Sequence, residues 1–136
     1  MPHVLLAADE SWVREDVRSV LSSWPDLTVR EVASGPEVLA AAQEQLPDLA
    51  VLDLQIGNMG AMAVCLDLRL EEGAGRLGHV PVLMLLDRRA DVFLARRSDA
   101  EGWLVKPLDP LRLRRAVTEL LEGRTYHDDS YQPAPV

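Results

Sequence analysis

Four side chains that could do chemistry together each stand where a short apolar run of the sequence ends. They are two acids near the N-terminus, one acid in the middle and one lysine near the C-terminus: Asp9, Glu10, Asp53 and Lys106. Carboxylate oxygens suit Mg²⁺, and an ammonium group can pair with a phosphoryl oxygen. An aspartate in such surroundings can accept a phosphoryl group as a nucleophile. These residue types predict phosphoryl chemistry if the fold brings them together.

The elements that must position these residues alternate along the chain. Short apolar segments typical of strands lie at residues 3–8, 27–33, 49–54, 81–86 and 102–105. The intervals between and after them carry helical patterns, at about 13–24, 38–46, 60–72, 88–99 and 113–121. This alternation predicts an α/β fold with a parallel, doubly wound sheet covered on both faces. Because ligands bind beyond the carboxyl ends of such strands, the four side chains are expected at one edge.

Two helix starts are marked by capping residues. Ser34 followed by Glu37 predicts a capping box with Pro36 in the first turn of the helix. Asp109 followed by Pro110 predicts an aspartate cap with proline at the first helical position.

Composition limits the other possibilities. The chain has 136 residues, 48% hydrophobic and 26% charged, which fits one domain with a single core. We assign the domain to residues 1–122 and a polar, proline-bearing, flexible tail to 123–136. The net charge of −8 argues against direct nucleic-acid binding. No signal peptide or membrane segment is evident, so we expect a cytoplasmic protein, with its one cysteine, Cys65, in the core.

The order of four motifs resembles the receiver domain of bacterial two-component response regulators. The motifs are LLAADESWVR, PDLAVLDLQIGNMG, VPVLMLLD and GWLVKPLDP, and the resemblance covers roughly residues 3–122. It implies a five-stranded parallel sheet in the order 2-1-3-4-5, as in CheY and flavodoxin. It also implies that Asp53 accepts a phosphoryl group from a histidine kinase or phosphotransfer protein.

The resemblance implies roles for further positions. Lys106 would contact the acyl phosphate, and its bond to Pro107 would be cis. Magnesium would be held by Asp9, Asp53 and the backbone carbonyl of Gln55, with Glu10 able to contribute.

Three departures from the family pattern surround the same site. Ala8 stands where the family usually has the first of two adjacent acids, which should weaken magnesium binding. Leu86 and Asp87 stand where a threonine or serine and then a small residue usually follow the fourth strand. Leu86 lacks the hydroxyl of the usual switch, and Asp87 adds a negative charge that opposes a phosphoryl group. The aromatic switch position is Trp103, and the short interval from Leu86 to Lys106 predicts a shortened fourth helix.

These observations lead to two hypotheses about function. The first is a stand-alone receiver, phosphorylated on Asp53, which signals to a downstream protein and uses the fourth helix, fifth strand and fifth helix for partner or homodimer contacts. The second is an atypical receiver that works as an interaction module without phosphorylation, with Asp53 and Lys106 forming a structural ion pair and Asp9 complementing a helix dipole. An enzyme is not expected, because phosphatases with an aspartyl-phosphate intermediate carry a second acid where Gln55 stands here.

Overall fold

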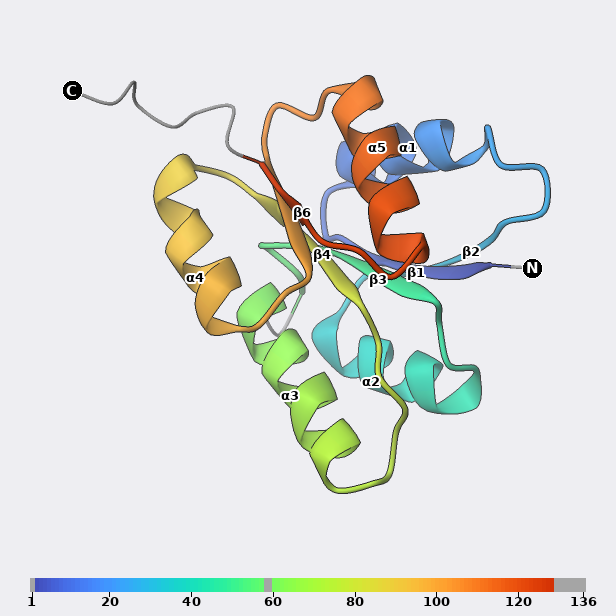
Figure 1. Cartoon of the computed structure of the whole chain (residues 1–136), viewed down its shortest axis with the longest axis vertical. Coiled ribbons are helices and arrows are strands. Elements are labelled where there is room, and N and C mark those ends of the chain that lie inside the picture. The colour runs from blue at the N-terminus through green and yellow to red at the C-terminus, as the bar shows by residue number, and fades with distance from the viewer. Residues whose placement is uncertain (1, 58–59, 129–136) are drawn as a thin grey trace.

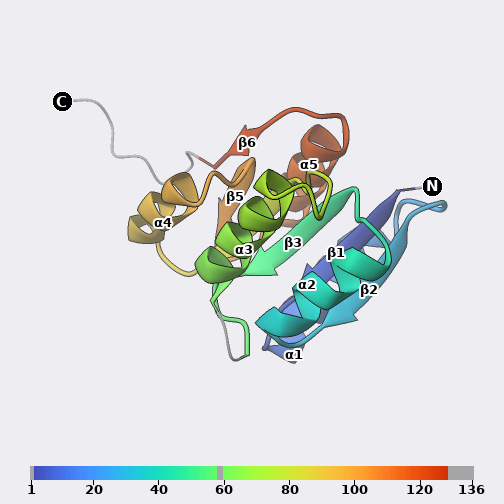
Figure 2. The same cartoon turned by 90° about the horizontal axis from the view of Figure 1, so that it is seen from below.

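The strands of the protein form one parallel sheet, seen edge-on and face-on in Figures 1 and 2. The computed structural model describes residues 2–57 and 60–128. The sheet order is β2-β1-β3-β4-β5-β6, and every neighbouring pair is parallel. The strands are β1 (His3–Ala7), β2 (Thr28–Val32), β3 (Leu49–Asp53), β4 (Val82–Leu86), β5 (Gly102–Val105) and β6 (Tyr126–His127). The predicted doubly wound α/β fold and the order of its first five strands are confirmed.

Helices cover both faces of this sheet. They are α1 (Ser11–Leu21), α2 (Gly35–Glu44), α3 (Ala61–Gly73), α4 (Val92–Arg97) and α5 (Pro110–Leu121), with a 3₁₀ turn, η1 (Arg89–Asp91), before α4. Helices α2 and α3 lie on one face and α1 and α5 on the other (Figure 2). Helix α4 has only six residues, in agreement with the shortened fourth helix that the sequence predicts.

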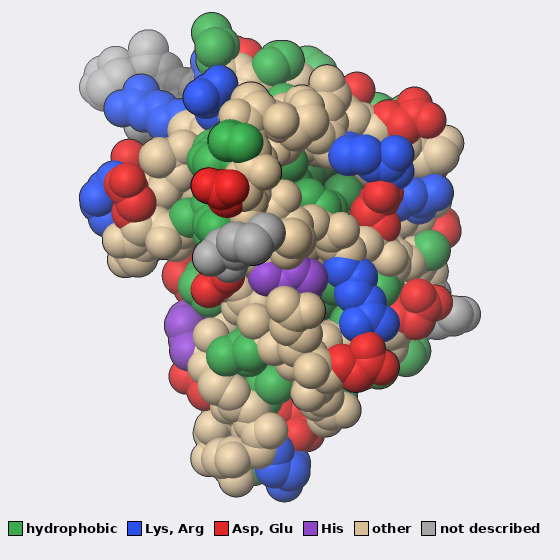
Figure 3. Space-filling model, turned by 90° about the vertical axis from the view of Figure 1, so that its right-hand side faces the viewer, with side chains coloured by type: hydrophobic (Ala, Val, Ile, Leu, Met, Phe, Trp, Pro, Cys, Tyr) green, Lys and Arg blue, Asp and Glu red, His purple; other side chains and the backbone are tan. Residues whose placement is uncertain are grey.

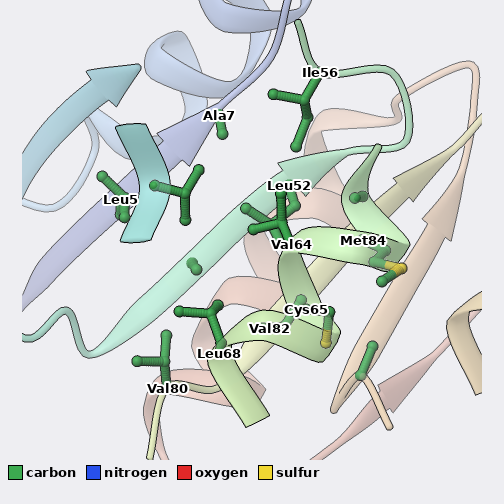
Figure 4. Close-up of a cluster of buried hydrophobic side chains, with 14 of the residues drawn as sticks. Leu5, Ala7, Leu52, Ile56, Val64, Cys65, Leu68, Val80, Val82 and Met84 are labelled. Carbon is green, nitrogen blue, oxygen red and sulfur yellow. The ribbon is translucent and has the colours of Figure 1, made fainter. Parts of the chain in front are cut away.

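The covering helices explain why the inner strands β1, β3 and β4 are buried at every position. Leu5 and Ala7 of β1 face the cluster under α2 and α3, whereas Val4 and Leu6 face the cluster under α1 and α5. Strands buried on both faces lose the alternation of polar and apolar residues. Figure 4 shows the first cluster, in which Cys65 is buried as expected and its Sγ lies 3.1 Å from the Ser98 carbonyl oxygen. Cys65 is fully buried in the core, and this burial raises the pKa of its thiol to about 11.

The C-terminal segment departs from the sequence prediction. Residues 123–136 were expected to form a flexible tail, but Tyr126 and His127 pair with Gly102 and Trp103 as the sixth strand. The expectation does not hold for these two residues, because a strand of two residues is too short to show a periodic pattern. Residues 129–136 lie outside the described part of the chain.

The two predicted helix caps have different outcomes. Asp109 caps α5 as expected, since its Oδ1 accepts a hydrogen bond from the Leu111 N–H at 3.0 Å. The capping box at Ser34 is wrong: the hydroxyl lies 2.9 Å from Glu37 Oε1 and makes no hydrogen bond to the helix backbone.

We therefore expect different costs when the two caps are removed. Asp109→Ala should lower the free energy of unfolding by about 1 kcal/mol, because it leaves a backbone N–H of α5 without its partner. Ser34→Ala is the matched control and should cost clearly less. Urea denaturation followed by circular dichroism measures both, and equal losses would show that the Asp109 cap has no special effect.

Within the described residues, no helix is both long enough and apolar enough to cross a membrane. The face in Figure 3 carries acidic and basic side chains in close alternation, without a continuous basic patch.

Candidate functional site

The carboxyl edge of the sheet brings two of the four candidate side chains into direct contact. Asp53 is the last residue of β3, and Lys106 follows β5 directly. Lys106 Nζ lies 2.6 Å from Asp53 Oδ1, and the Lys106 side chain is 12% exposed. The Lys106–Pro107 peptide bond is cis. Residues 53 positions apart in the sequence thus form a buried ion pair.

Asp53 has one satisfied and one unsatisfied carboxylate oxygen. The residue is fully buried, and Oδ2 has no hydrogen-bond partner among the described residues. Burial raises the pKa of the carboxyl group, although the neighbouring Lys106 ammonium opposes this shift. A buried anionic oxygen with no partner is energetically costly, so Oδ2 is the atom of this site at which a cation or an electrophile would be most strongly favoured.

Lys106 has a second acidic partner, Asp87. The two side chains meet at 2.8 Å, and the Asp87 side chain is 39% exposed. Strand pairing explains this contact. Leu86 pairs with Val105 at the ends of β4 and β5, so the residues that follow them, Asp87 and Lys106, lie side by side. Burial lowers the pKa of Lys106, but the two carboxylates outweigh it and hold the pKa above its ordinary value. Lys106 is therefore charged and shared between Asp53 and Asp87.

An aromatic ring completes the surroundings of this ammonium group. Lys106 Nζ lies 5.6 Å from the ring centre of Trp12, which extends from the first turn of α1. A cation over an indole face is stabilised by the negative charge of the ring face. Residue spacing in the sequence gives no sign that Trp12 reaches Lys106.

The two apolar residues beside the site that depart from the family pattern are buried. Ala8 and Leu86 are both fully buried, and each packs in one of the two hydrophobic clusters. Leu86 thus offers a methyl group where a hydroxyl would be expected from the resemblance. Trp103, the predicted aromatic switch position, is 3% exposed.

The remaining candidate metal ligands lie in the loops beside β1 and β3. Asp9 and Glu10 are exposed, and the Asp9 N–H donates to the Gln55 carbonyl oxygen at 3.4 Å. Arg14 donates to the backbone carbonyls of Ala8 and Asp9, which places a positive charge at this loop. In the part of the chain that is described, no group of three His, Cys, Asp or Glu side chains is arranged to hold a metal ion.

These donors fit a magnesium ion only in part. The orphaned Asp53 Oδ2 is a suitable anionic ligand, and the Gln55 carbonyl and the Asp9 carboxylate belong to adjacent loops. The buried methyl group of Ala8 supplies no oxygen. Magnesium usually binds proteins through one or two carboxylates and several waters, and this set offers carboxylates of that number.

The fold and the site define the class of this protein: a doubly wound α/β domain with a buried aspartate and a lysine at the carboxyl edge of its sheet. A family model described as the response regulator receiver domain matches residues 4–118. The chain belongs to this family, which confirms the resemblance seen in the sequence.

Individual relatives agree with this assignment. An uncharacterized response regulatory protein of Mycobacterium tuberculosis, MT3230, is 35% identical over 125 residues, which cover 88% of this chain and 91% of that protein. The nitrate/nitrite response regulator protein NarL of Escherichia coli is 28% identical over 131 residues. This match covers 96% of the present chain but only 59% of NarL. The chain therefore spans less than two thirds of that relative.

Solved structures show the same fold. The chemotaxis response regulator CheY4 of Vibrio cholerae superposes with a TM-score of 0.76 at 26% sequence identity, over 88% of this chain and 98% of CheY4. The similarity therefore extends over nearly the whole of that structure.

Proposed function

We propose that this receiver accepts a phosphoryl group on Asp53 from a histidine kinase or a phosphotransfer protein and signals through contacts with a downstream protein. The observation that carries the proposal is the pairing of Asp53 Oδ1 with Lys106 while Oδ2 has no partner. The match to MT3230 over 91% of that protein's length supports a receiver that acts as a unit of its own. Receiver domains are in general signalling modules, and we assign no enzymatic turnover to this one.

The chemistry would follow from the two different oxygens of Asp53. Oδ2 attacks the phosphorus of a phosphohistidine, the P–N bond breaks, and the imidazole leaves with the bonding electron pair. Lys106 keeps Asp53 oriented through Oδ1 and can turn toward an oxygen of the arriving phosphoryl group. The products are an acyl phosphate on Asp53 and a neutral histidine on the donor once the imidazole is protonated.

Magnesium is the cofactor that the family generally binds here. In this chain Asp53, Asp9 and the Gln55 carbonyl would hold it, with Glu10 as an additional acid. When bound, the ion neutralises charge on the phosphoryl oxygens. The missing acid at Ala8 leads us to expect weaker binding than in receivers with both acids.

Phosphorylation can be tested by intact-protein mass spectrometry. Incubation with Mg²⁺ and a small phosphodonor such as acetyl phosphate should add the mass of one phosphoryl group to the wild-type chain and none to Asp53→Asn. Asp48→Asn is a control, because that acid lies at the opposite end of β3 and accepts the His3 N–H at 2.7 Å. A mass increase that persists in folded Asp53→Asn would show that another residue is modified.

A second candidate function is an interaction module that does not use phosphorylation. Asp87 favours it, because that carboxylate already occupies Lys106 in the chain itself. The closed apolar positions Ala8 and Leu86 favour it as well. If the folded wild-type chain gains no mass at millimolar phosphodonor and magnesium, this second candidate replaces the first.

A further inference from the structure

Asp87 is an acid beside the site that the proposed phosphotransfer does not use. Its Oδ1 lies 2.8 Å from Lys106 Nζ, and Asp53 Oδ1 lies 2.6 Å from the same atom. Two carboxylates that bind one ammonium group must lie close together. Burial is the main cause of the raised pKa of Asp53, and the negative charge of Asp87 adds to it. A phosphoryl group on Asp53 would therefore arrive next to a second carboxylate.

The three side chains form a path from the interior of the protein to its surface. Asp53 is fully buried, Lys106 is nearly buried, and Asp87 is partly exposed. Water that attacks the phosphorus must come from the side opposite the Asp53 oxygen, because the attacking and leaving oxygens lie roughly in line. That side faces the solvent, since Asp53 lies in the interior. Asp87 is thus at the end of the path from which the water would come.

The other side chains that border this path offer no proton acceptor. The ring centre of Trp12 lies 5.6 Å from Lys106 Nζ, and an indole N–H can only donate. Leu86 and Ala8 present methyl groups and are fully buried. Of these four side chains, only Asp87 can take a proton from water.

Phosphorylation would itself make Asp87 available as a base. In the unphosphorylated chain, the charge of Asp87 is matched by Lys106. A phosphoryl group carries about two negative charges at neutral pH, so it attracts the ammonium group more strongly than a single carboxylate does. A carboxylate that loses its cationic partner and gains an anionic neighbour accepts a proton more readily. Asp87 would therefore become the stronger base while Asp53 is modified.

We propose that Asp87 is a general base for hydrolysis of the acyl phosphate, so that the site removes the phosphoryl group that Asp53 has accepted. This inference rests on the proposed phosphotransfer and adds the step that ends it. Water attacks the phosphorus, and one water proton passes to Asp87. The bond between phosphorus and Asp53 Oδ2 breaks, and its electron pair returns to that oxygen. Inorganic phosphate leaves, Asp87 releases its proton to solvent, and Lys106 is again shared by the two carboxylates.

Repulsion and base catalysis by Asp87 have opposite effects on the lifetime of the acyl phosphate. A negative charge at this position repels an anionic phosphoryl group. If repulsion were the only effect of Asp87, the neutral variant Asp87→Asn would lose the phosphoryl group faster than the wild type. If Asp87 is the base, the same variant loses it more slowly. The direction of the change therefore separates the two roles.

Decay of the phosphorylated full chain measures this direction. Acetyl phosphate with Mg²⁺ phosphorylates the protein, rapid desalting removes the donor, and intact-protein mass spectrometry follows loss of the phosphoryl group. We expect Asp87→Asn to lengthen the lifetime at least about tenfold, because a general base contributes roughly a hundredfold or more and the lost repulsion offsets part of it. Asp87→Glu keeps a carboxylate and should restore most of the rate.

The control variant is Asp26→Asn, which removes an exposed acid before the amino end of β2, at the opposite edge of the sheet. It should decay as the wild type does. Hydrolysis of the wild type should also be slower in D₂O than in H₂O, because a proton moves in the transition state, and Asp87→Asn should lose most of this difference.

The possible results separate this inference from the proposed phosphotransfer. The inference is overturned if phosphorylated Asp87→Asn decays as fast as the wild type or faster. It is also overturned if Asp87→Asn decays more slowly but keeps the full isotope effect, since Asp87 would then not take the proton. If the wild-type chain takes up no phosphoryl group, the proposed phosphotransfer fails and the inference fails with it.

Discussion

Replacing Lys106 with methionine is expected to lower the free energy of unfolding by about 3–5 kcal/mol at neutral pH, because it leaves the buried Asp53 carboxylate without its counter-ion. Asp53 is fully buried, and its other oxygen already lacks a partner. The effect should therefore exceed that of removing an exposed ion pair, which is worth about 1 kcal/mol or less. Arg30→Met breaks the exposed pair with Glu44 and is the matched control.

The loss of unfolding free energy in Lys106→Met should depend on pH in a defined direction. Burial raises the pKa of Asp53 in the folded state, so the folded protein binds more protons than the unfolded chain between the ordinary pKa and the raised one. The contribution of Asp53 to the free energy of unfolding is therefore fully present below the pKa of Asp53 in the unfolded chain. It is lost as the pH rises through the pKa of Asp53 in the folded protein. Without Lys106 the folded pKa rises further, so the stability of Lys106→Met should fall over a wider pH range than that of the wild type.

The double variant Asp53→Asn/Lys106→Met separates loss of the ion pair from loss of packing. With a neutral amide at position 53, the methionine substitution should cost much less, and its pH dependence should disappear. Urea denaturation at pH values from acidic to neutral measures all four proteins of this cycle. A cost that is the same in the presence and absence of the Asp53 charge would contradict the ion-pair explanation.

The sequence was sufficient to place Asp53 and Lys106 but not their neighbours. Both residues follow strongly apolar segments, and parallel strands bring their carboxyl ends to one edge, so their proximity could be predicted. The contact between Lys106 and Asp87 depends on the register of β4 against β5, which no periodicity reveals. The negative charge of Asp87 is evident from the sequence, but its contact with Lys106 is not.

Two aromatic contacts were missed for a similar reason. Trp12 and Trp103 are large residues that fit a helix and a strand by propensity alone, and their partners come from distant segments. His127 reaches Trp103 only because the chain turns after α5 and forms β6 parallel to β5. Such contacts are set by tertiary packing, whereas local patterns determine the existence and order of the elements.

Lys106 is the only lysine of the chain; the other basic residues that carry a full charge are arginines. A strongly hydrated point charge on a flexible stem can exchange between two acceptors more readily than a planar guanidinium group. At this position the lysine already has two acceptors, Asp53 and Asp87. A phosphoryl group on Asp53 would become a third, and it would have to compete with Asp87 for the same ammonium.

We therefore expect Asp87→Ala to bind a phosphoryl mimic more tightly than the wild type. Hydrogen bonds to charged groups are worth about 1.5–3 kcal/mol, and the partial exposure of Asp87 favours the lower end, so beryllofluoride with Mg²⁺ should bind about tenfold more tightly. Asp87→Asn should lie between the two, since it removes the charge but keeps an acceptor. Because Lys106 is the only lysine, selective ¹³C labelling of lysine gives one side-chain signal whose shift follows the titration.

The titration also distinguishes competition from a general loss of negative charge. Asp91→Ala removes a nearby acid that binds Arg88 instead of Lys106, and it should leave the affinity for beryllofluoride close to that of the wild type in folded protein. If Asp87→Ala and Asp91→Ala tighten binding equally, net charge and not occupation of Lys106 controls the site. If Asp87→Ala binds no more tightly than the wild type, Asp87 does not compete with the phosphoryl group for Lys106.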